Sequence, residues 1–126
     1  MNFRFCNDRP IYIQLVEQLE IYIVSGSIEP GSRLPSVREL AASCEVNPNT
    51  MQKALSELEN LHLIYTERTN GKFVTTDKKT IRKRKEKYAE TKALSFFESM
   101  AELGFSSDEA IEYLKERREK NEITRN

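Results

Sequence analysis

The chain has 126 residues, of which 38% are hydrophobic and 32% are charged. This length gives one domain, or one small domain with an appendage, and it excludes a large enzyme with separate cofactor and substrate domains. Lysines and arginines number 20, as do aspartates and glutamates, so the formal net charge is zero. Global charge therefore gives no support to nucleic-acid binding, and any such role must rest on where particular residues lie.

The charge is distributed unevenly, because residues 78–87 hold seven basic residues and one acidic residue. We interpret this run as a solvated helix surface. The less favoured alternative is a role in facing DNA phosphates, because the run directly follows the predicted hairpin. No apolar stretch approaches the ~20 residues of a membrane span and no signal sequence is visible, so we expect a cytoplasmic protein without a membrane partner. The two cysteines lack CxxC spacing and there is one histidine; we predict no metal and no cofactor.

The first strong helical period covers roughly residues 10–25. Apolar side chains recur every third or fourth position, at Ile11, Leu15, Leu19 and Ile23. This spacing places them on one face of an amphipathic helix. Pro10 stands at the opening, where its missing N–H costs nothing, and Gly26 marks the end.

Two shorter helices are predicted next, separated by three or four residues. Ser36 and Glu39 have the spacing of a capping box, so a helix is expected from Ser36 to about Ser43. Asn47 is a good N-cap and Pro48 suits the first position of the following helix. The short connection is typical of a helix-turn-helix.

The second of these helices has a polar face opposite its apolar one. Asn49, Gln52, Lys53 and Ser56 fall at i, i+3, i+4 and i+7. Amides, a hydroxyl and a cation are side chains that read base edges and phosphates in a major groove. An ordinary solvated helix face would show the same pattern, and composition alone does not separate the two interpretations.

A β-hairpin follows the helix-turn-helix. Residues 61–66 are rich in β-formers, Asn70-Gly71 favours a type I′ turn, and residues 73–75 supply the return strand. This order predicts a winged helix, whose tip (Arg68, Asn70, Gly71 and Lys72) could reach a minor groove or phosphates. The alternative is a hairpin that only covers the core.

The C-terminal tail has the pattern of two helices, at about residues 80–103 and 106–120, separated by Gly104. Two such helices cannot enclose a core alone. We favour pairing with a second copy over packing on the chain's own winged domain, because DNA readers with one recognition helix usually work as symmetric dimers. The expected dimerisation residues are Ala89, Ala93, Phe96, Phe97, Met100, Leu103, Phe105, Ile111 and Leu114.

Four segments of the chain are informative when they are taken together. They are Pro10-Ile11-Tyr12, the stretch from Gly26 through Pro30-Gly31, the run Leu-Pro-Ser-Val-Arg-Glu-Leu-Ala at 34–41, and Val-Asn-Pro-Asn-Thr at 46–50. In this order they resemble the GntR family of bacterial transcription regulators. The Ser-Val-Arg-Glu-Leu and Asn-Pro-Asn-Thr versions, with a short tail, are similar to the YtrA-type branch. Two departures stand out: Glu45 replaces the family's usual glycine, and the wing has one glycine fewer.

The resemblance implies a set of DNA contacts. Residues of the first helix of the motif would touch phosphates and bases, the start of the second would lie in the major groove, and the wing tip would enter the minor groove. Residue by residue, the implied contacts are Ser36 and Arg38; Asn47, Asn49, Thr50, Gln52 and Lys53; and Asn70, Gly71 and Lys72.

We therefore predict a mainly α fold with a small β-hairpin: a winged helix-turn-helix DNA-binding domain at 8–77 and a two-helix dimerisation tail at 78–126. The resemblance implies a homodimeric repressor bound to an operator with two half-sites. It also implies control of the chain's own operon, commonly one for an ABC transporter. An unidentified small-molecule effector is a further candidate partner, bound at the dimer seam.

Two rival functions compete with this interpretation. An enzyme needs a nucleophile–base pair or paired carboxylates, and neither His62, in an apolar segment, nor Cys44, between two helices, suggests one. We predict no catalytic residue. A winged helix that binds proteins is the alternative that the zero net charge keeps open.

Overall fold

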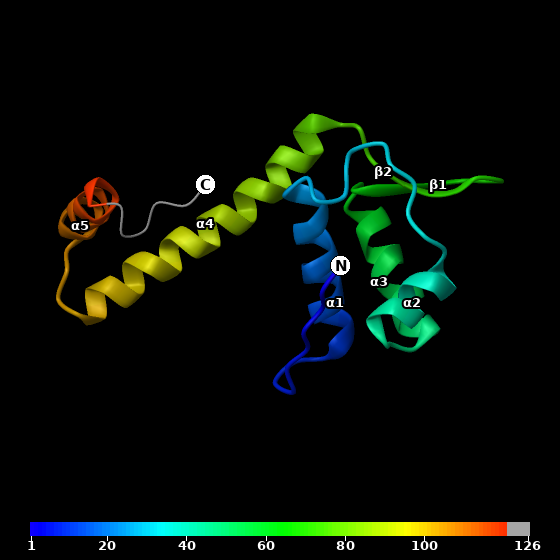
Figure 1. The fold of residues 1–126 in the computed structure, drawn as a ribbon, viewed down its shortest axis with the longest axis horizontal. Helices are drawn as coiled ribbons and strands as arrows, with labels where there is room; N and C mark the ends of the chain where they lie inside the picture. The colour runs from blue at the N-terminus through cyan, green and yellow to red at the C-terminus, as the bar shows by residue number, and fades with distance from the viewer. Residues whose placement is uncertain (121–126) are drawn as a thin grey trace. The chain divides into compact units, whose positions relative to one another are not determined.

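The computed structural model describes residues 1–120. It contains five helices and one hairpin in this range, in the order α1 (Ile11–Val24), α2 (Val37–Cys44), α3 (Pro48–Asn60), β1 (Ile64–Glu67), β2 (Gly71–Val74), α4 (Lys78–Glu102) and α5 (Ser107–Glu119) (Figure 1). Contacts divide the chain into two compact units, residues 1–85 and the part from Glu86 onward. The first turns of α4 thus belong to the N-terminal unit.

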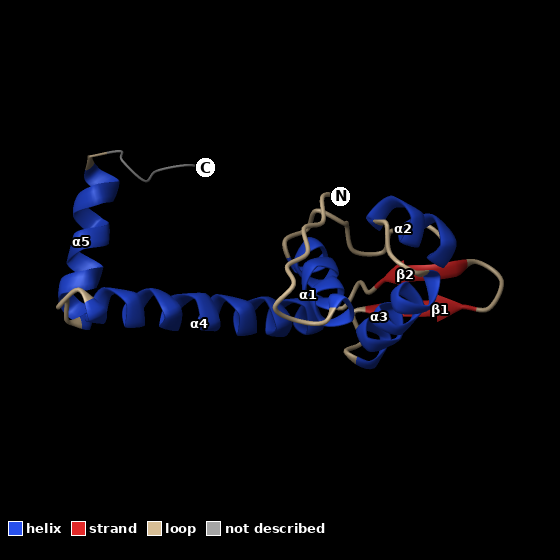
Figure 2. Cartoon of the chain, turned by 90° about the horizontal axis from the view of Figure 1, so that it is seen from below, coloured by secondary structure: helices blue, strands red, loops and turns tan. Residues whose placement is uncertain are grey.

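The N-terminal unit is built around α3, which packs against α1, α2 and β1. Figure 2 shows these helices clustered at one end of the hairpin, which extends beyond them. Apolar faces at helical spacing meet in one core, since each helix must bury its stripe against another element. The fully buried core residues include Leu15, Leu19, Met51, Leu55, Leu58 and Val74. The predicted winged helix-turn-helix is confirmed.

The helix-turn-helix begins as its capping residues predict. Ser36 Oγ accepts a hydrogen bond from the Glu39 backbone N–H at 3.1 Å, and the Glu39 carboxylate accepts one from the Ser36 N–H at 2.9 Å. Both halves of the capping box are therefore present. Asn47 caps α3 through the Asn49 N–H at 2.7 Å, and Pro48 is its first residue. Unpaired N–H groups at both helix starts are satisfied in this way.

The turn between α2 and α3 uses a left-handed residue. Glu45 has a φ of 57°, and the next N–H, of Val46, donates to the Ala41 carbonyl at 3.0 Å. This is the Schellman arrangement, in which glycine usually occupies the left-handed position because a Cβ is strained there. The replacement of glycine by Glu45 therefore leaves the turn intact and strained.

The same motif ends α3, where the composition favours a strand. His62 has a φ of 63°, and the N–H of Leu63 donates to the Leu58 carbonyl at 3.0 Å. The prediction that β structure begins at Leu61 was wrong, and β1 begins at Ile64. The apolar side chain of Leu63 is buried, but its backbone closes a helix.

The hairpin turn also differs from its prediction. Glu67 pairs with Gly71, so three residues, 68–70, make the loop. A type I′ turn needs a positive φ at both Asn70 and Gly71, and only Gly71 has one, at 98°. The Asn70 N–H donates to the Glu67 carbonyl at 3.3 Å. The turn is therefore of the three-residue kind, in which a glycine follows a tight turn.

An N-terminal arm, residues 1–9, is held along α1 by side chains. The Gln18 amide bonds both backbone groups of Arg4, at 3.0 and 2.6 Å, and the Gln14 amide bonds both of Cys6, at 2.7 and 2.9 Å. Alternate residues of an extended chain and every fourth residue of a helix advance by similar lengths, about 6–7 Å. The two periods match, so one face of α1 can bind successive residues of the extended arm.

The C-terminal unit contains the rest of α4 together with α5. Gly104, with a φ of 95°, ends α4, and Ser106 and Glu109 form a second capping box at the start of α5. The predicted pair of tail helices is confirmed. Within residues 1–120, no helix is both long enough and apolar enough to cross a membrane.

Candidate nucleic-acid interface

The polar face of α3 is turned outward. Met51, Leu55 and Leu58 are buried on one side, and the opposite positions are all exposed, namely Asn49, Gln52, Lys53 and Ser56. The Gln52 amide lies 3.3 Å from Ser56 Oγ on the next turn. Buried and polar faces therefore separate cleanly, which leaves these side chains available to a partner.

Two of the candidate residues at the start of α3 have structural roles. The Asn47 side chain is engaged in the helix cap, and Thr50 is half-buried. Lys53 Nζ lies 4.5 Å from the ring centroid of Tyr12, at the start of α1. A cation over a tyrosine face is attracted to it. Tyr12 thereby limits where the Lys53 ammonium can lie, a contact that the sequence did not reveal.

The candidate residues of α2 lie at its exposed N-terminal end. Ser36 is exposed although its Oγ is used in the capping box. Arg38, in the first turn of the helix, is exposed, and its side chain makes no hydrogen bond or ion pair within residues 1–120. Its guanidinium is therefore available for the bidentate hydrogen bonds that arginine makes to phosphate or guanine.

Lys72 lies between the wing and α3 rather than at the wing tip. Its Nζ donates to Glu59 Oε1 at 3.2 Å and to Thr66 Oγ1 at 2.9 Å, and Thr66 Oγ1 donates to Glu59 Oε2 at 2.6 Å. Only 17% of the Lys72 side chain is exposed. The hydrogen bond from Thr66, and after it that from Lys72, lowers the pKa of the Glu59 carboxyl. This network (Glu59, Thr66, Lys72) joins the C-terminal part of α3 to the hairpin.

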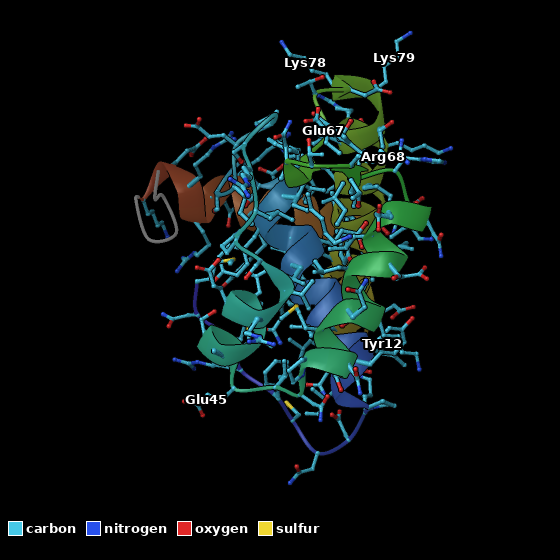
Figure 3. The ribbon with its side chains drawn as sticks, turned by 90° about the vertical axis from the view of Figure 1, so that its right-hand side faces the viewer. Tyr12, Glu45, Glu67, Arg68, Lys78 and Lys79 are labelled. Carbon is cyan, nitrogen blue, oxygen red and sulfur yellow. The ribbon has the colours of Figure 1, made fainter. Side chains whose placement is uncertain are left out.

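The exposed wing tip is formed by Arg68, Thr69 and Asn70. Figure 3 shows Glu67 and Arg68 at the hairpin and Glu45 at the turn between α2 and α3. The Asn70 amide donates to Glu67 Oε1 at 3.1 Å. Of the candidate wing residues, Asn70 thus lies at the tip, whereas Gly71 and Lys72 belong to β2.

Comparison with known protein families identifies the family that shares this helix-turn-helix and wing. Residues 11–74 match the model of the family described as bacterial regulatory proteins, gntR family. The chain belongs to the GntR family. It is a DNA-binding transcriptional regulator of that family.

Two relatives from Bacillus subtilis (strain 168) support the YtrA-type branch. The uncharacterized HTH-type transcriptional regulator YhcF is 36% identical over 115 residues, which cover 91% of this chain and 95% of YhcF. The HTH-type transcriptional repressor YtrA is 44% identical over 71 residues, 56% of this chain and 55% of YtrA. The relatives are regulators, which agrees with the prediction that the chain is not an enzyme.

Solved structures share the fold of this GntR-family chain. A GntR family transcriptional regulator from Listeria monocytogenes superposes with a TM-score of 0.79 at 40% identity, over 89% of this chain and 98% of that one. The DNA-binding domain of AraR, solved in complex with operator ORX1, gives a TM-score of 0.54 at 28% identity, over 60% of this chain and 96% of that one.

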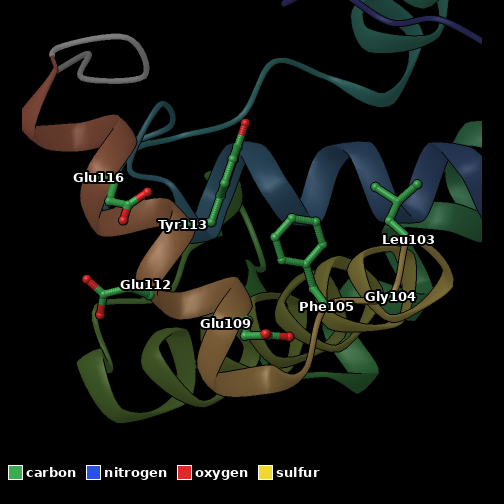
Figure 4. Close-up of a pocket in the computed structure, with 7 residues that line it drawn as sticks. All are labelled: Leu103, Gly104, Phe105, Glu109, Glu112, Tyr113 and Glu116. Atoms are coloured by element: carbon green, nitrogen blue, oxygen red, sulfur yellow. The ribbon is translucent and has the colours of Figure 1, made fainter.

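The tail of this GntR-family chain leaves most of its apolar residues exposed or only partly buried. None of the nine candidate dimerisation residues is buried. Leu103 is 74% exposed, Ile111 40% and Leu114 38%. Phe105 and Tyr113 meet edge to face, with centroids 5.7 Å apart, beside a shallow hollow of about 390 Å³. Figure 4 shows Glu109, Glu112 and Glu116 along α5 at this hollow.

The cysteines and the histidine are not arranged for catalysis. Burial raises the pKa of the Cys44 thiol, whereas Cys6 is exposed on the arm. His62 serves as the left-handed residue after α3. Within residues 1–120, no three His, Cys, Asp or Glu side chains cluster as metal ligands would.

Proposed function

We propose that the chain is a sequence-specific repressor that binds, as a homodimer, an operator with two half-sites. The observation that carries this proposal is the exposed face of Asn49, Gln52, Lys53 and Ser56 on a helix whose other face is fixed in the core. A rigid helix with outward amides fits a major groove, where amides pair with adenine edges. Membership of a DNA-binding family supports the same interpretation.

The other contacts are assigned by their position in the fold. Arg38, exposed and without a partner in residues 1–120, is proposed to contact a base edge or phosphate beside α3. Asn70 at the wing tip is proposed to reach the minor groove, with Gly71 allowing close backbone approach. Lys72 is proposed to contribute to DNA binding indirectly, by fixing the wing against α3, because its ammonium group already donates hydrogen bonds to Glu59 and Thr66.

The homodimer is proposed from the exposed apolar tail. Leu94, Leu103 and Ile111 are 58%, 74% and 40% exposed. Such side chains gain roughly 25 cal/mol for each Å² of apolar surface removed from water. A second copy would bury them and would also present two α3 helices to two half-sites, as symmetric regulators do.

The regulated genes are a proposal from the family alone. YtrA is named a repressor, and we propose that this chain likewise represses, acting on its own operon, with an ABC-transporter operon as the specific expectation. We place its action in the cytoplasm, where the operator DNA is. An unidentified small molecule, bound at the seam of the dimer, is the proposed effector.

The test is binding of the full chain to DNA from its own promoter region, first by footprinting and then by fluorescence anisotropy of the protected duplex. Gln52→Ala and Arg38→Ala should each weaken operator binding by about 1–3 kcal/mol if they touch bases. Asn60→Ala, an exposed change at the far end of α3, is the control and should bind as the parent does.

Two outcomes would refute the proposal. Parent-like operator affinity in both Gln52→Ala and Arg38→Ala would show that α3 does not read the groove. A parent chain with no salt-sensitive duplex binding would favour the protein-binding winged helix instead, since counterion release makes DNA binding fall steeply between about 50 and 200 mM salt.

A further inference from the structure

The loop before α2 pairs with β2 of the wing through an isolated β-bridge. The Gly31 N–H donates to the Val74 carbonyl at 2.8 Å, and the Val74 N–H donates to the Ser32 carbonyl at 2.9 Å. The Leu34 N–H donates to the Lys72 carbonyl at 2.8 Å. Residue 33 therefore sits opposite Phe73 in an antiparallel bridge. Hydrogen bonds on both sides fix the backbone of Arg33 to β2.

The Arg33 side chain lies along the wing at Gly71. A Cβ built on Gly71 would come within 3.3 Å of Arg33 Nε and 3.5 Å of Nη2, so the absence of a side chain there leaves space for the guanidinium. Arg33 is exposed and makes no hydrogen bond or ion pair within residues 1–120. A guanidinium that is held in place by its backbone and has no hydrogen-bonded acceptor within residues 1–120 is poised to bind an external anion.

A hollow of about 420 Å³ opens beside Arg33, lined by Leu34, Pro35, Ser36 and Glu39. The Glu39 carboxylate in this hollow is used in the capping box. The backbone hydrogen bond from Ser36, and to a smaller extent the charge of Arg33, lowers the pKa of Glu39. Glu39 therefore completes the helix cap, and the five N–H groups of Arg33 keep no fixed acceptor.

We propose that Arg33 binds a backbone phosphate of the DNA between the major groove and the minor groove. This inference rests on the proposed function, in which α2 and α3 face the major groove and the wing tip the minor groove. In a duplex the sugar–phosphate backbone separates the two grooves. Arg33 lies between α2 and the wing, so the part of the DNA that it meets is phosphate.

The position of Arg33 along the hairpin argues for a phosphate contact rather than base reading. The residues that lead the wing are 68–70, whereas Arg33 lies level with Gly71 and Phe73, behind the loop. Arg33 is thus assigned as a positioning contact that fixes the wing on the backbone whatever the sequence. Its loss should weaken all duplexes alike.

The test compares Arg33→Lys, Arg33→Gln and Arg33→Glu in the full chain. Each is titrated against one mixed-sequence duplex of about 30 base pairs, over a range of salt concentrations. Arg33→Gln should weaken binding roughly fivefold and flatten the plot of log K against log salt by about 0.9, the value for one phosphate contact. Arg33→Lys should keep the parental slope, and Arg33→Glu should flatten it further.

Arg9→Gln is the matched control, because Arg9 is exposed, pairs with Glu17 at 2.9 Å and belongs to the N-terminal arm. It removes the same charge and should leave the slope unchanged. A parental slope in Arg33→Gln, an equal loss in Arg9→Gln, or a loss that does not follow the charge at residue 33 would each overturn the inference. A parent chain without salt-dependent duplex binding would refute the proposed function itself.

Discussion

The two units of the chain differ in how far their apolar side chains are buried. In residues 1–85, three helices and a hairpin cover one another, and Leu15 and Leu55 have no exposed surface. From residue 86 on, within the described range, Ala110 alone among the apolar residues is buried, while Leu94 and Leu103 are more than half exposed. Two helices form one layer, and a core needs at least two layers. The N-terminal unit is therefore stabilised from within, and the tail by whatever covers it.

The largest expected effect follows from this contrast, with Leu55→Ala and Leu103→Ala as matched changes. Leu55→Ala leaves a cavity in the core and should lower the free energy of unfolding by about 4 kcal/mol. Leu103→Ala should leave the unfolding of a dilute sample unchanged and weaken self-association. Urea unfolding and sedimentation at several concentrations measure the two effects. An equal loss of stability in both variants would show that the tail has a core of its own.

A second, smaller effect concerns the ion pair between Glu20 of α1 and Arg84 of α4. Glu20 is 1% exposed, and Arg84 donates to both of its carboxylate oxygens, one of them at 3.1 Å. Arg84→Met should cost about 3 kcal/mol, because it leaves a buried carboxylate without this cation. The double variant with Glu20→Gln should recover part of that loss in urea unfolding. A single variant as stable as the parent would contradict the assignment of the first turns of α4 to the N-terminal unit.

The elements that could be predicted from sequence are those specified by neighbours in the chain. Ser36 with Glu39, and Asn47 with Pro48, mark helix starts through contacts within four residues, and all were found as expected. The predictions for His62 and for the hairpin turn were wrong because β-forming composition and the Asn-Gly pair express only local preferences. In the folded chain, the free carbonyl groups at the end of α3 accept backbone hydrogen bonds from the residues that follow, and this extends the helix cap to Leu63.

The candidate site likewise has one part that could be predicted from local sequence and another that depends on contacts between distant parts of the chain. The outward face of α3 follows from helical periodicity and needs no tertiary information. The contacts of Lys72 with Glu59, of Lys53 with Tyr12 and of Arg33 with the wing join distant parts of the chain. The arm on α1 is of this kind too, since the alternation of Phe3 and Phe5 with polar residues indicates an extended segment but does not identify the helix against which it lies.

The third prediction concerns the left-handed residues Glu45 and His62, whose replacement should raise stability rather than lower it. Glu45→Gly should raise the free energy of unfolding by about 0.5–1 kcal/mol, because the strain of a Cβ at positive φ outweighs the greater freedom of glycine in the unfolded chain. His62→Gly, at the same position of the same motif, should give a similar gain. Thermal unfolding of both variants measures it. A loss of stability in both would mean that these side chains make contacts worth more than the strain.

The smallest expected effect is a dependence of stability on pH from the network that joins α3 to the wing. The folded-state pKa of Glu59 lies below its ordinary value, so its contribution is present above the unfolded pKa and is lost as the pH falls through the folded one. Glu59→Gln should therefore cost stability at neutral pH, by less than about 1 kcal/mol, because solvent screens a carboxylate whose side chain is 33% exposed. The difference from the parent should shrink in acid.

Thr66→Val distinguishes this network from a general surface charge effect. It removes the hydrogen bond that contributes most to lowering the pKa of Glu59, so the acid-sensitive cost of Glu59→Gln should be smaller in chains that also carry Thr66→Val. The measurement is urea unfolding at neutral and acidic pH for the four chains of this double-mutant cycle. An unchanged cost would place the charge of Glu59 outside the hydrogen-bond network.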